Sequence, residues 1–337
     1  MFTEVFEDIV RRHSQTSAVS AIEAGGDHAP AWKAIKDSGF LELMAREEDG
    51  GAGLDLAGVL PILTMLGAHA VPLPVGQAIA LRTLLPAGEP VPTGLPTFAP
   101  ALVREEGGAL LALRVPFGIL ADVVLGELNG ELQLMDARTA DRRAIGIHRD
   151  MTADLRWAAP ENGCRTLHGA VPPGGLAAWG AALHAALLAG AMSRSFELAL
   201  QYANDRSQFG RSIGKFQAVQ HQLALMAEHV GAARMAAAGA FAAGRTVPVL
   251  LSAAIAKARA SEAVTEVAAI AHAVHGAIGV TEEYDLQLFT RRLHAWRMAH
   301  GSEDHWHRLI GEQVLGAASA APLHLFAEHA AGGSHRT

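Results

Sequence analysis

Three residues in one twenty-residue run have side chains that could hold a nucleotide cofactor. The run extends from Gln201 to Gln220, and it places Arg206, Phe209 and Gln217 within about twelve residues of one another. A guanidinium grips two phosphate oxygens in a fixed fork, and an amide hydrogen-bonds a ligand without adding charge. The combination suits a diphosphate joined to a flat heterocycle. Taken alone, Arg206 could equally form a salt bridge with Asp205.

Two further segments contain glycines that could allow the backbone to approach a ligand. One extends from His275 to Tyr284 and includes Gly276 and Gly279, and the other is the Gly-Gly turn between Glu47 and Leu54. Glycine lacks a side chain, but it also ends helices in a left-handed turn. Both roles are therefore open for Gly276 and Gly279.

These three segments together resemble the signature segments of the acyl-CoA dehydrogenase family, whose members use FAD to desaturate acyl-CoA thioesters. The resemblance spans nearly the whole chain. It implies that Arg206 contacts the FAD pyrophosphate, that Phe209 packs on the cofactor, and that Gln217 hydrogen-bonds it across a subunit interface. It further implies an acyl-CoA substrate, an electron-transfer flavoprotein as electron acceptor, and an oligomer, either of identical chains or with a paralogous dehydrogenase subunit.

The chain departs from the family pattern at the catalytic base. Desaturation requires a group that removes the α proton while a hydride leaves the β carbon, and the family uses a glutamate. By resemblance that position is His300, and the alternative family position near Gly180 has no carboxylate either. His300 could act as the base because imidazole titrates at about 6.5. Glu303 is a second candidate, although a glutamate at a helix N-terminus also stabilises the helix dipole.

Other positions match or depart from the family's cofactor contacts. Ser302 and Asp304 match positions that reach the adenosine part of FAD. Ala273 replaces a usual glutamine, and the region from Leu95 to Ala101 lacks the family's hydroxyl-rich loop. The segment from Arg114 to Gly118 either replaces the strand that lines the flavin ring or packs in the core.

The departures leave two main hypotheses for function. The first is an FAD-dependent acyl-CoA dehydrogenase, which carries out α,β-dehydrogenation with a relocated base. The second is a catalytically silent, partly flavin-binding partner subunit that works beside an active paralogue. A helical scaffold without a ligand is disfavoured because it gives no reason for the spacing of Arg206, Phe209 and Gln217.

A metal site is not predicted. The cluster of His294, His300, His305 and His307 offers imidazoles, the commonest transition-metal ligands, but no His-Glu-x-x-His or paired Cys-x-x-Cys accompanies it.

Changes of pattern along the chain predict three domains in a mainly α fold with a small central β domain. Residues 1–90 show helical spacing broken by Gly and Pro and predict an N-terminal helical domain. Residues 91–173 contain short apolar runs, with a hairpin predicted at Asn129-Gly130, and form a β-barrel-like middle domain by resemblance. Residues 174–337 have a 3.6-residue period and predict a C-terminal four-helix bundle, with a third helix ending near Gly276 and a last helix from Ser302 to Ala321.

Composition narrows the class of protein further. With 337 residues, of which 50% are hydrophobic, the chain can bury a large core. A formal net charge of −7 argues against nucleic acid as a partner. The single cysteine, Cys164, excludes an intrachain disulfide framework and favours a reducing compartment. The first twelve residues lack a secretion signal, and the apolar window at 176–192 is too short for a membrane span, so we expect a buried helix and a cytoplasmic protein.

Overall fold

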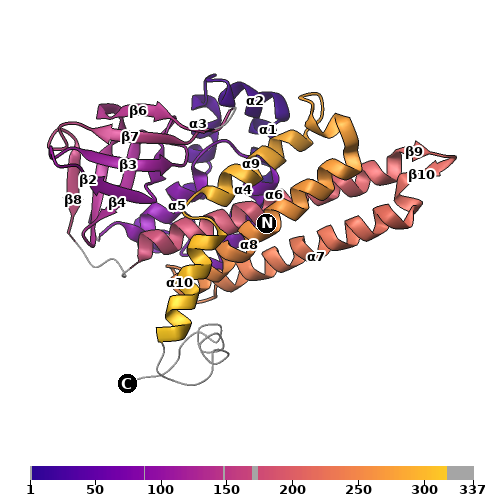
Figure 1. Ribbon diagram of the computed structural model, residues 1–337. Helices are drawn as coiled ribbons and strands as arrows, with labels where there is room; N and C mark the ends of the chain where they lie inside the picture. The colour runs from indigo at the N-terminus through magenta and orange to yellow at the C-terminus, as the bar shows by residue number, and fades with distance from the viewer. Residues whose placement is uncertain (1, 87, 147–148, 169–173, 317–337) are drawn as a thin grey trace.

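The computed structural model describes residues 2–86, 88–146, 149–168 and 174–316. The β domain lies at one end of the molecule, long helices extend from it, and a small hairpin projects beyond them at the other end (Figure 1). The structure confirms the predicted architecture, which is mainly α, with a small β domain in the middle of the sequence.

Five helices form the N-terminal part, followed in sequence by the β strands. They are α1 (Phe2–His13), α2 (Thr16–Glu23), α3 (Ala29–Asp37), α4 (Leu56–Ala68) and α5 (Val75–Leu84). Helix α4 starts where the Asp55 carboxylate accepts a hydrogen bond from the Gly58 amide at 2.8 Å, an ordinary N-terminal cap. Between α3 and α4 the predicted Gly-Gly turn is present, because Gly50 has a φ of 81° and follows a short 3₁₀ turn.

The β domain consists, within the described residues, of two four-stranded sheets that do not close into a barrel. The first has the order β1 (Pro96–Phe98), β4 (Val123–Leu128), β5 (Glu131–Asp136), β8 (Cys164–Leu167), and the second has the order β2 (Ala101–Arg104), β3 (Leu110–Val115), β7 (Ala153–Trp157), β6 (Asp141–Ala144). The predicted hairpin is confirmed between β4 and β5. Its turn residues Asn129 and Gly130 both have positive φ, 54° and 81°, as a type I′ turn requires.

The C-terminal part is a helical bundle. It contains α6 (Gly175–Asp205), α7 (Gln217–Ala240), α8 (Leu250–His275), α9 (Leu286–Met298) and α10 (Glu303–Gly316). Helix α8 ends where the sequence predicted, just before Gly276. The last helix begins directly after Ser302, the residue predicted to cap it, and its predicted end at Ala321 lies outside the described residues. Helix α9 was not predicted from the sequence.

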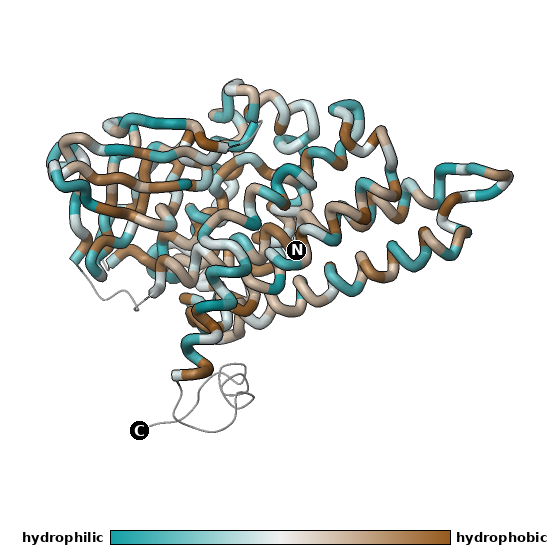
Figure 2. Tube along the Cα trace, viewed as in Figure 1, coloured by the Kyte–Doolittle hydropathy of each residue, from teal (hydrophilic) through white to brown (hydrophobic). Residues whose placement is uncertain are grey.

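Helix α6 forms the centre of the molecule. Nearly every side chain from Leu176 to Met192 is buried, as predicted for that window. Helices α4 and α6 approach closely, because a Cβ added at Gly190 would lie 1.9 Å from the Thr64 carbonyl oxygen, so only glycine fits there. Figure 2 shows hydrophobic stretches along both the strands of the β domain and the helices of the bundle.

Two apolar stretches are long enough to cross a bilayer by length and composition alone. They are Gly175–Asp205 and Leu250–Val280, and their most apolar windows are 94% and 50% buried within the structure. The helix that contains the window at 176–192 is thus longer than that window, which alone was judged too short to span a membrane, and its 94% burial is typical of a helix in a protein core.

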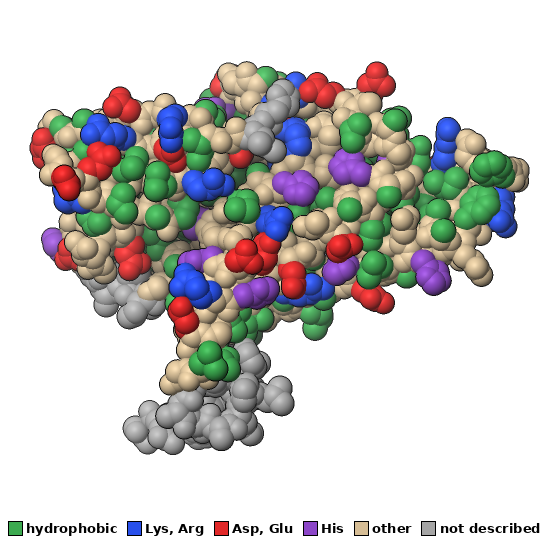
Figure 3. Space-filling model, viewed as in Figure 1, with side chains coloured by type: hydrophobic (Ala, Val, Ile, Leu, Met, Phe, Trp, Pro, Cys, Tyr) green, Lys and Arg blue, Asp and Glu red, His purple; other side chains and the backbone are tan. Residues whose placement is uncertain are grey.

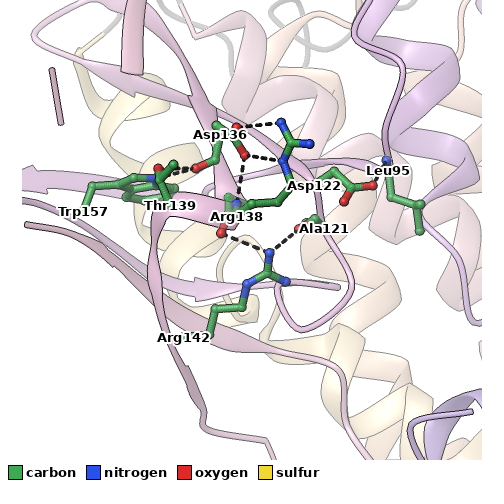
Figure 4. Close-up of polar contacts among 9 residues, drawn as sticks. Leu95, Ala121, Asp122, Asp136, Arg138, Thr139, Arg142 and Trp157 are labelled. Carbon is green, nitrogen blue, oxygen red and sulfur yellow. Dashed lines mark hydrogen bonds and ion pairs between the residues drawn. The ribbon is translucent and has the colours of Figure 1, made fainter. Parts of the chain in front are cut away.

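A hydrogen-bond network fixes the loop between β3 and β4 (Figure 4). The Arg142 guanidinium donates to the carbonyl oxygens of Ile119 at 2.7 Å, Ala121 at 2.8 Å and Ala137 at 3.0 Å. Nearby, the Asp122 carboxylate accepts a hydrogen bond from the Leu95 amide at 2.9 Å. These contacts give hydrogen-bond donors to backbone carbonyl oxygens that are not paired within a β sheet. They therefore hold the loop in one conformation.

Replacement of Arg142 by alanine is expected to lower the free energy of unfolding by about 1–2 kcal/mol, because several carbonyls lose a charged donor that is only partly exposed to water. Urea denaturation measures this change. The matched control is Arg138→Ala, which removes an exposed ion pair with Asp136 and should lower the free energy of unfolding by less than Arg142→Ala does. Equal losses in the two variants would contradict the structural role given to Arg142.

Candidate functional site

The segment with the cofactor-type residues forms a projecting arm at the far end of α6 and α7 (Figure 1). We define the arm as residues 206–217. It contains a short hairpin of β9 (Ser207–Gln208) and β10 (Arg211–Ser212), and its turn residues Phe209 and Gly210 have φ values of 53° and 78°. The Ser212 hydroxyl donates to the Ala203 carbonyl at 2.6 Å and joins the hairpin to α6.

The arm presents its three predicted cofactor residues to the outside. Phe209 is 93% exposed, which is unusual for a large apolar side chain, and Arg206 and Gln217 are exposed as well. Within the described residues, the side chains of Arg206 and Gln217 form no hydrogen bond or ion pair, so the salt bridge with Asp205 is absent. Figure 3 shows hydrophobic and basic side chains together at this tip. The arm is therefore available to a ligand or partner.

Contacts inside the arm give it a defined shape. The Arg211 guanidinium lies 4.1 Å from the centre of the Phe216 ring, and the Phe209 ring meets Phe216 edge to face at 6.3 Å. Such cation–π and aromatic pairs restrict side chains even at exposed positions. Phe216 directly precedes Gln217, so this cluster also sets the start of α7.

The glycine segment lies at the root of the arm. The His275 ring at the end of α8 packs against the Tyr202 ring of α6 at 4.6 Å, four residues before Arg206. Gly276 has a φ of 64° and ends α8, while Gly279 is buried where an added Cβ would lie 2.9 Å from the Cβ of His275. In this structure Gly276 has the helix-ending role and Gly279 permits close packing.

The structure does not bring the candidate base close to the arm within one chain. His300 packs on Gly180, near the start of α6, whereas Arg206 follows Gly180 by 26 residues at the end of the same helix. At 1.5 Å per residue these points are about 39 Å apart. Any single site that used both the arm and the turn at His300 would have to be completed by another chain.

His300 is buried and fills the space left by Gly180. It is 6% exposed, has a φ of 52°, and its Nδ1 would lie 2.1 Å from a Cβ added at position 180. Its ring centre lies 5.0 Å from that of His184, whose Nδ1 contacts the Gly180 carbonyl at 2.8 Å. Burial, together with His184 and Lys257, holds the pKa of His300 well below its usual range. The imidazole is therefore neutral at neutral pH and enclosed by protein.

Glu303 is engaged in an ion pair. Both of its carboxylate oxygens accept hydrogen bonds from Arg297 Nε, at 3.0 and 2.9 Å, and this pairing lowers the pKa of Glu303. The neighbouring cofactor candidates Ser302 and Asp304 are half-buried and exposed, respectively. Of this turn, only Ser302 and Asp304 present polar groups that are not already committed within the described residues.

A cleft between the β domain and α9 was not predicted as a site. Pro116 and Phe117 of the segment 114–118 line one side, and Arg291, Arg292 and Trp296 of α9 line the other. Glu23 from α2 also lines the cleft and forms an ion pair with Arg292 at 2.8 Å. Burial lowers the pKa of Arg292 to about 10. Pro116 and Phe117 thus lie along this cleft, while Val115 of the same segment is buried in the core, and whether the segment lines a flavin ring stays a prediction.

Within the described ranges, no three His, Cys, Asp or Glu side chains converge as metal ligands would. His294 lies on α9, His300 precedes α10, and His305 and His307 lie two residues apart on α10, so their side chains point to different sides of that helix.

Acid is expected to destabilise the fold through the buried imidazoles. Burial lowers the pKa of His184 to about 3, whereas an unfolded histidine titrates near 6.5, so the unfolded chain takes up protons first. The stabilisation is complete above about pH 6.5 and decreases as the pH falls toward 3, by about 1.4 kcal/mol per pH unit for each imidazole. Urea denaturation at several pH values measures it. His300→Asn, which tolerates a positive φ, should weaken the dependence, while the exposed His221→Asn should not.

Comparison with known proteins identifies the class to which this fold and site belong. The family model for the acyl-CoA dehydrogenase C-terminal domain matches residues 175–315. Acyl-CoA dehydrogenase IpdE2 of Mycobacterium tuberculosis is 33% identical over 303 residues, which cover 87% of this chain and 90% of that protein. The chain therefore belongs to the acyl-CoA dehydrogenase family, and the expected class, an acyl-CoA dehydrogenase-like flavoprotein oxidoreductase, is confirmed.

Particular relatives and structures support the same fold. IpdE2 of Mycolicibacterium smegmatis is also 33% identical, over 87% of this chain and 91% of its own length. A chain of the ChsE4-ChsE5 complex from M. tuberculosis superposes with a TM-score of 0.81 at 21% identity, covering 94% of this chain and 97% of that one. Butyryl-CoA dehydrogenase from Megasphaera elsdenii gives a TM-score of 0.70 at 18% identity, covering 93% and 98%.

Proposed function

We propose that this chain is one subunit of a heteromeric FAD-dependent acyl-CoA dehydrogenase, in which a paralogous subunit supplies the catalytic base. The main support for this proposal is the distance, within one chain, between the arm and the turn at His300. The exposed arm lies about 39 Å from the buried turn that takes the place of the family's base. The arm is equipped to bind, but its own chain offers no base within reach.

The arm residues suit a cofactor held chiefly by another subunit. Arg206 would grip the pyrophosphate, Phe209 would cover an apolar surface of the cofactor, and Gln217 would accept or donate a hydrogen bond. All three are exposed, and the described contacts leave their polar groups uncommitted. Gly276 and Gly279 would shape the root of the arm, and Ser302 and Asp304 would face the adenosine part of a cofactor at the other end.

The bound FAD would supply the acceptor for the hydride that leaves the substrate's β carbon. Proton removal from the α carbon needs a base that reaches the substrate. His300 is enclosed beneath the turn against Gly180, and Glu303 is held by Arg297. We therefore assign the base to the partner subunit and give this chain the tasks of cofactor binding and assembly.

A second candidate function is the dehydrogenase acting without a paralogue, with His300 as its base. The neutral imidazole favours it, because only the neutral form accepts a proton. This candidate requires the turn at His300 to open toward substrate. It also requires two identical chains to complete each other's sites.

The substrate, the electron acceptor and the cellular location are proposed from membership of the family. We propose an acyl-CoA thioester as substrate, an electron-transfer flavoprotein as electron acceptor, and a cytoplasmic location. Resemblance to a structure named as a complex, ChsE4-ChsE5, supports a mixed assembly over identical chains.

The experiment is to purify the chain alone and together with a paralogous dehydrogenase subunit from the same organism, and to record flavin absorbance and mass for both. The proposal predicts a stable mixed complex that is yellow and that bleaches with an acyl-CoA under anaerobic conditions. The chain alone should retain little FAD. A homo-oligomer with full flavin occupancy that bleaches by itself would reject the proposal in favour of the second candidate.

A further inference from the structure

A lysine is completely buried in the middle of α8. Lys257 is 0% exposed, although lysine is rarely buried without a specific partner. Its Nζ donates to the Ser261 hydroxyl at 2.7 Å and to the carbonyl oxygens of Arg297 at 2.8 Å and Gly301 at 2.9 Å. Three acceptors match the three hydrogens of an ammonium, so the geometry favours the charged form.

Two of these acceptors enclose the turn between α9 and α10. Arg297 is near the end of α9, and Gly301 precedes α10, so the carbonyls that Lys257 binds lie on either side of His300. His300 and Gly301 have φ values of 52° and 96°. A non-glycine residue in the left-handed region persists only where surrounding contacts hold it. Lys257 provides such contacts at both ends of the turn.

Two buried imidazoles also feel the charge of this ammonium. His184 comes from α6 and His300 from the turn, and the Nε2 atoms of both are buried without a hydrogen-bond partner in the described structure. Burial is the largest cause that lowers the pKa of each imidazole, and Lys257 lowers both further. Glu303 attracts the ammonium while Arg297 repels it, and on α10 His305 is also shifted by it.

The order of protonation follows from these neighbours. Burial lowers the pKa of Lys257 to about 7, which is still above the pKa of about 3 for His184. As the pH falls from 7, Lys257 therefore takes up its proton before His184 does. The cluster then holds one positive charge, and a second charge on an imidazole is opposed by the first.

We propose that Lys257 is the positioning residue of the α9–α10 turn, whose carbonyls at Arg297 and Gly301 its ammonium binds, and that its positive charge opposes a second charge on His184 or His300 beneath that turn. Lys257 acts through the turn and touches no substrate. The inference does not rest on the proposed function, because it concerns the charge state and rigidity of this chain by itself or in a complex.

The test compares Lys257→Met, which keeps most of the side-chain volume but removes the charge, with Ser261→Ala, which removes one acceptor and leaves the charge. Histidine-selective NMR titration should show His184 and His300 protonating at higher pH in Lys257→Met than in the unaltered protein. Amide exchange at residues 299–303 should accelerate about tenfold or more. Ser261→Ala should leave both imidazole midpoints near their original values.

Unchanged imidazole midpoints in a folded Lys257→Met protein would overturn the proposal, because burial alone would then explain the neutral rings. If that variant does not fold, lysine-selective NMR of the unaltered protein decides the matter. The proposal requires the Lys257 ammonium to be present below about pH 7, in the range where the imidazoles are still neutral. A Lys257 amine that stays neutral until the imidazoles take up protons would overturn it equally.

Discussion

Replacing Arg206 with glutamine is expected to weaken FAD binding by the assembled enzyme about ten- to a hundredfold. A charged hydrogen bond to phosphate contributes about 1.5–3 kcal/mol, and glutamine keeps a polar group without the charge or the fork. Stability should be unaffected, because the Arg206 side chain contacts no other described residue through a hydrogen bond or ion pair. Titration of the flavin-free complex with FAD, followed by flavin fluorescence, measures the change.

The matched control for Arg206 is Lys215→Gln, which removes another exposed positive charge from the same arm. This variant should alter FAD binding by less than about threefold if the guanidinium acts through a specific contact. Equal losses in both variants would indicate general electrostatic attraction. An Arg206→Gln complex that binds FAD normally would remove the arm from the cofactor site.

Adding a single methyl group at Gly180 is the second change with a large expected effect. In Gly180→Ala the new Cβ would lie 2.1 Å from His300 Nδ1, so the imidazole and its turn must move. We expect the free energy of unfolding to fall by about 1–3 kcal/mol, the usual cost of overpacking a core. Urea denaturation measures it.

Two further variants show whether His300 causes that loss. Combining Gly180→Ala with His300→Gly removes the clash and suits the positive φ at position 300, so the added methyl should then cost little. Gly231→Ala on the outer face of α7 has no neighbour within 4 Å of the new Cβ and should stabilise the helix by up to about 1 kcal/mol. A persistent penalty in the His300→Gly background would show that the space at Gly180 is limited by something else.

Much of the fold follows from local patterns in the sequence. The 3.6-residue period around Leu183 and Leu187 identified α6, and the Asn129-Gly130 turn identified the β4–β5 hairpin, because both signals arise from residues close together in the chain. The segment after Leu286 was harder to interpret. The cap at Ser302 predicted the start of α10, but no helix was predicted between Leu286 and Gly301, where the structure has α9.

The candidate site was predictable in its residue types but not in its spatial arrangement. The arm residues lie close together in sequence, and the spacing of Arg206, Phe209 and Gln217 was enough to predict them as candidates. The burial of His300 depends on the missing side chain of Gly180, 120 positions earlier, which no local pattern reveals. Lys257 was missed for a related reason. The single lysine among the alanines of α8 was a visible signal, but its three acceptors come from two different parts of the chain.

The most direct test of the central claim is the turnover number per bound FAD of the mixed complex carrying His300→Asn in this chain. The account predicts a value within about threefold of the unaltered complex, because proton removal belongs to the partner. A loss of about a hundredfold or more with FAD fully bound, the usual effect of removing a general base, would show that His300 performs the reaction and would contradict the account.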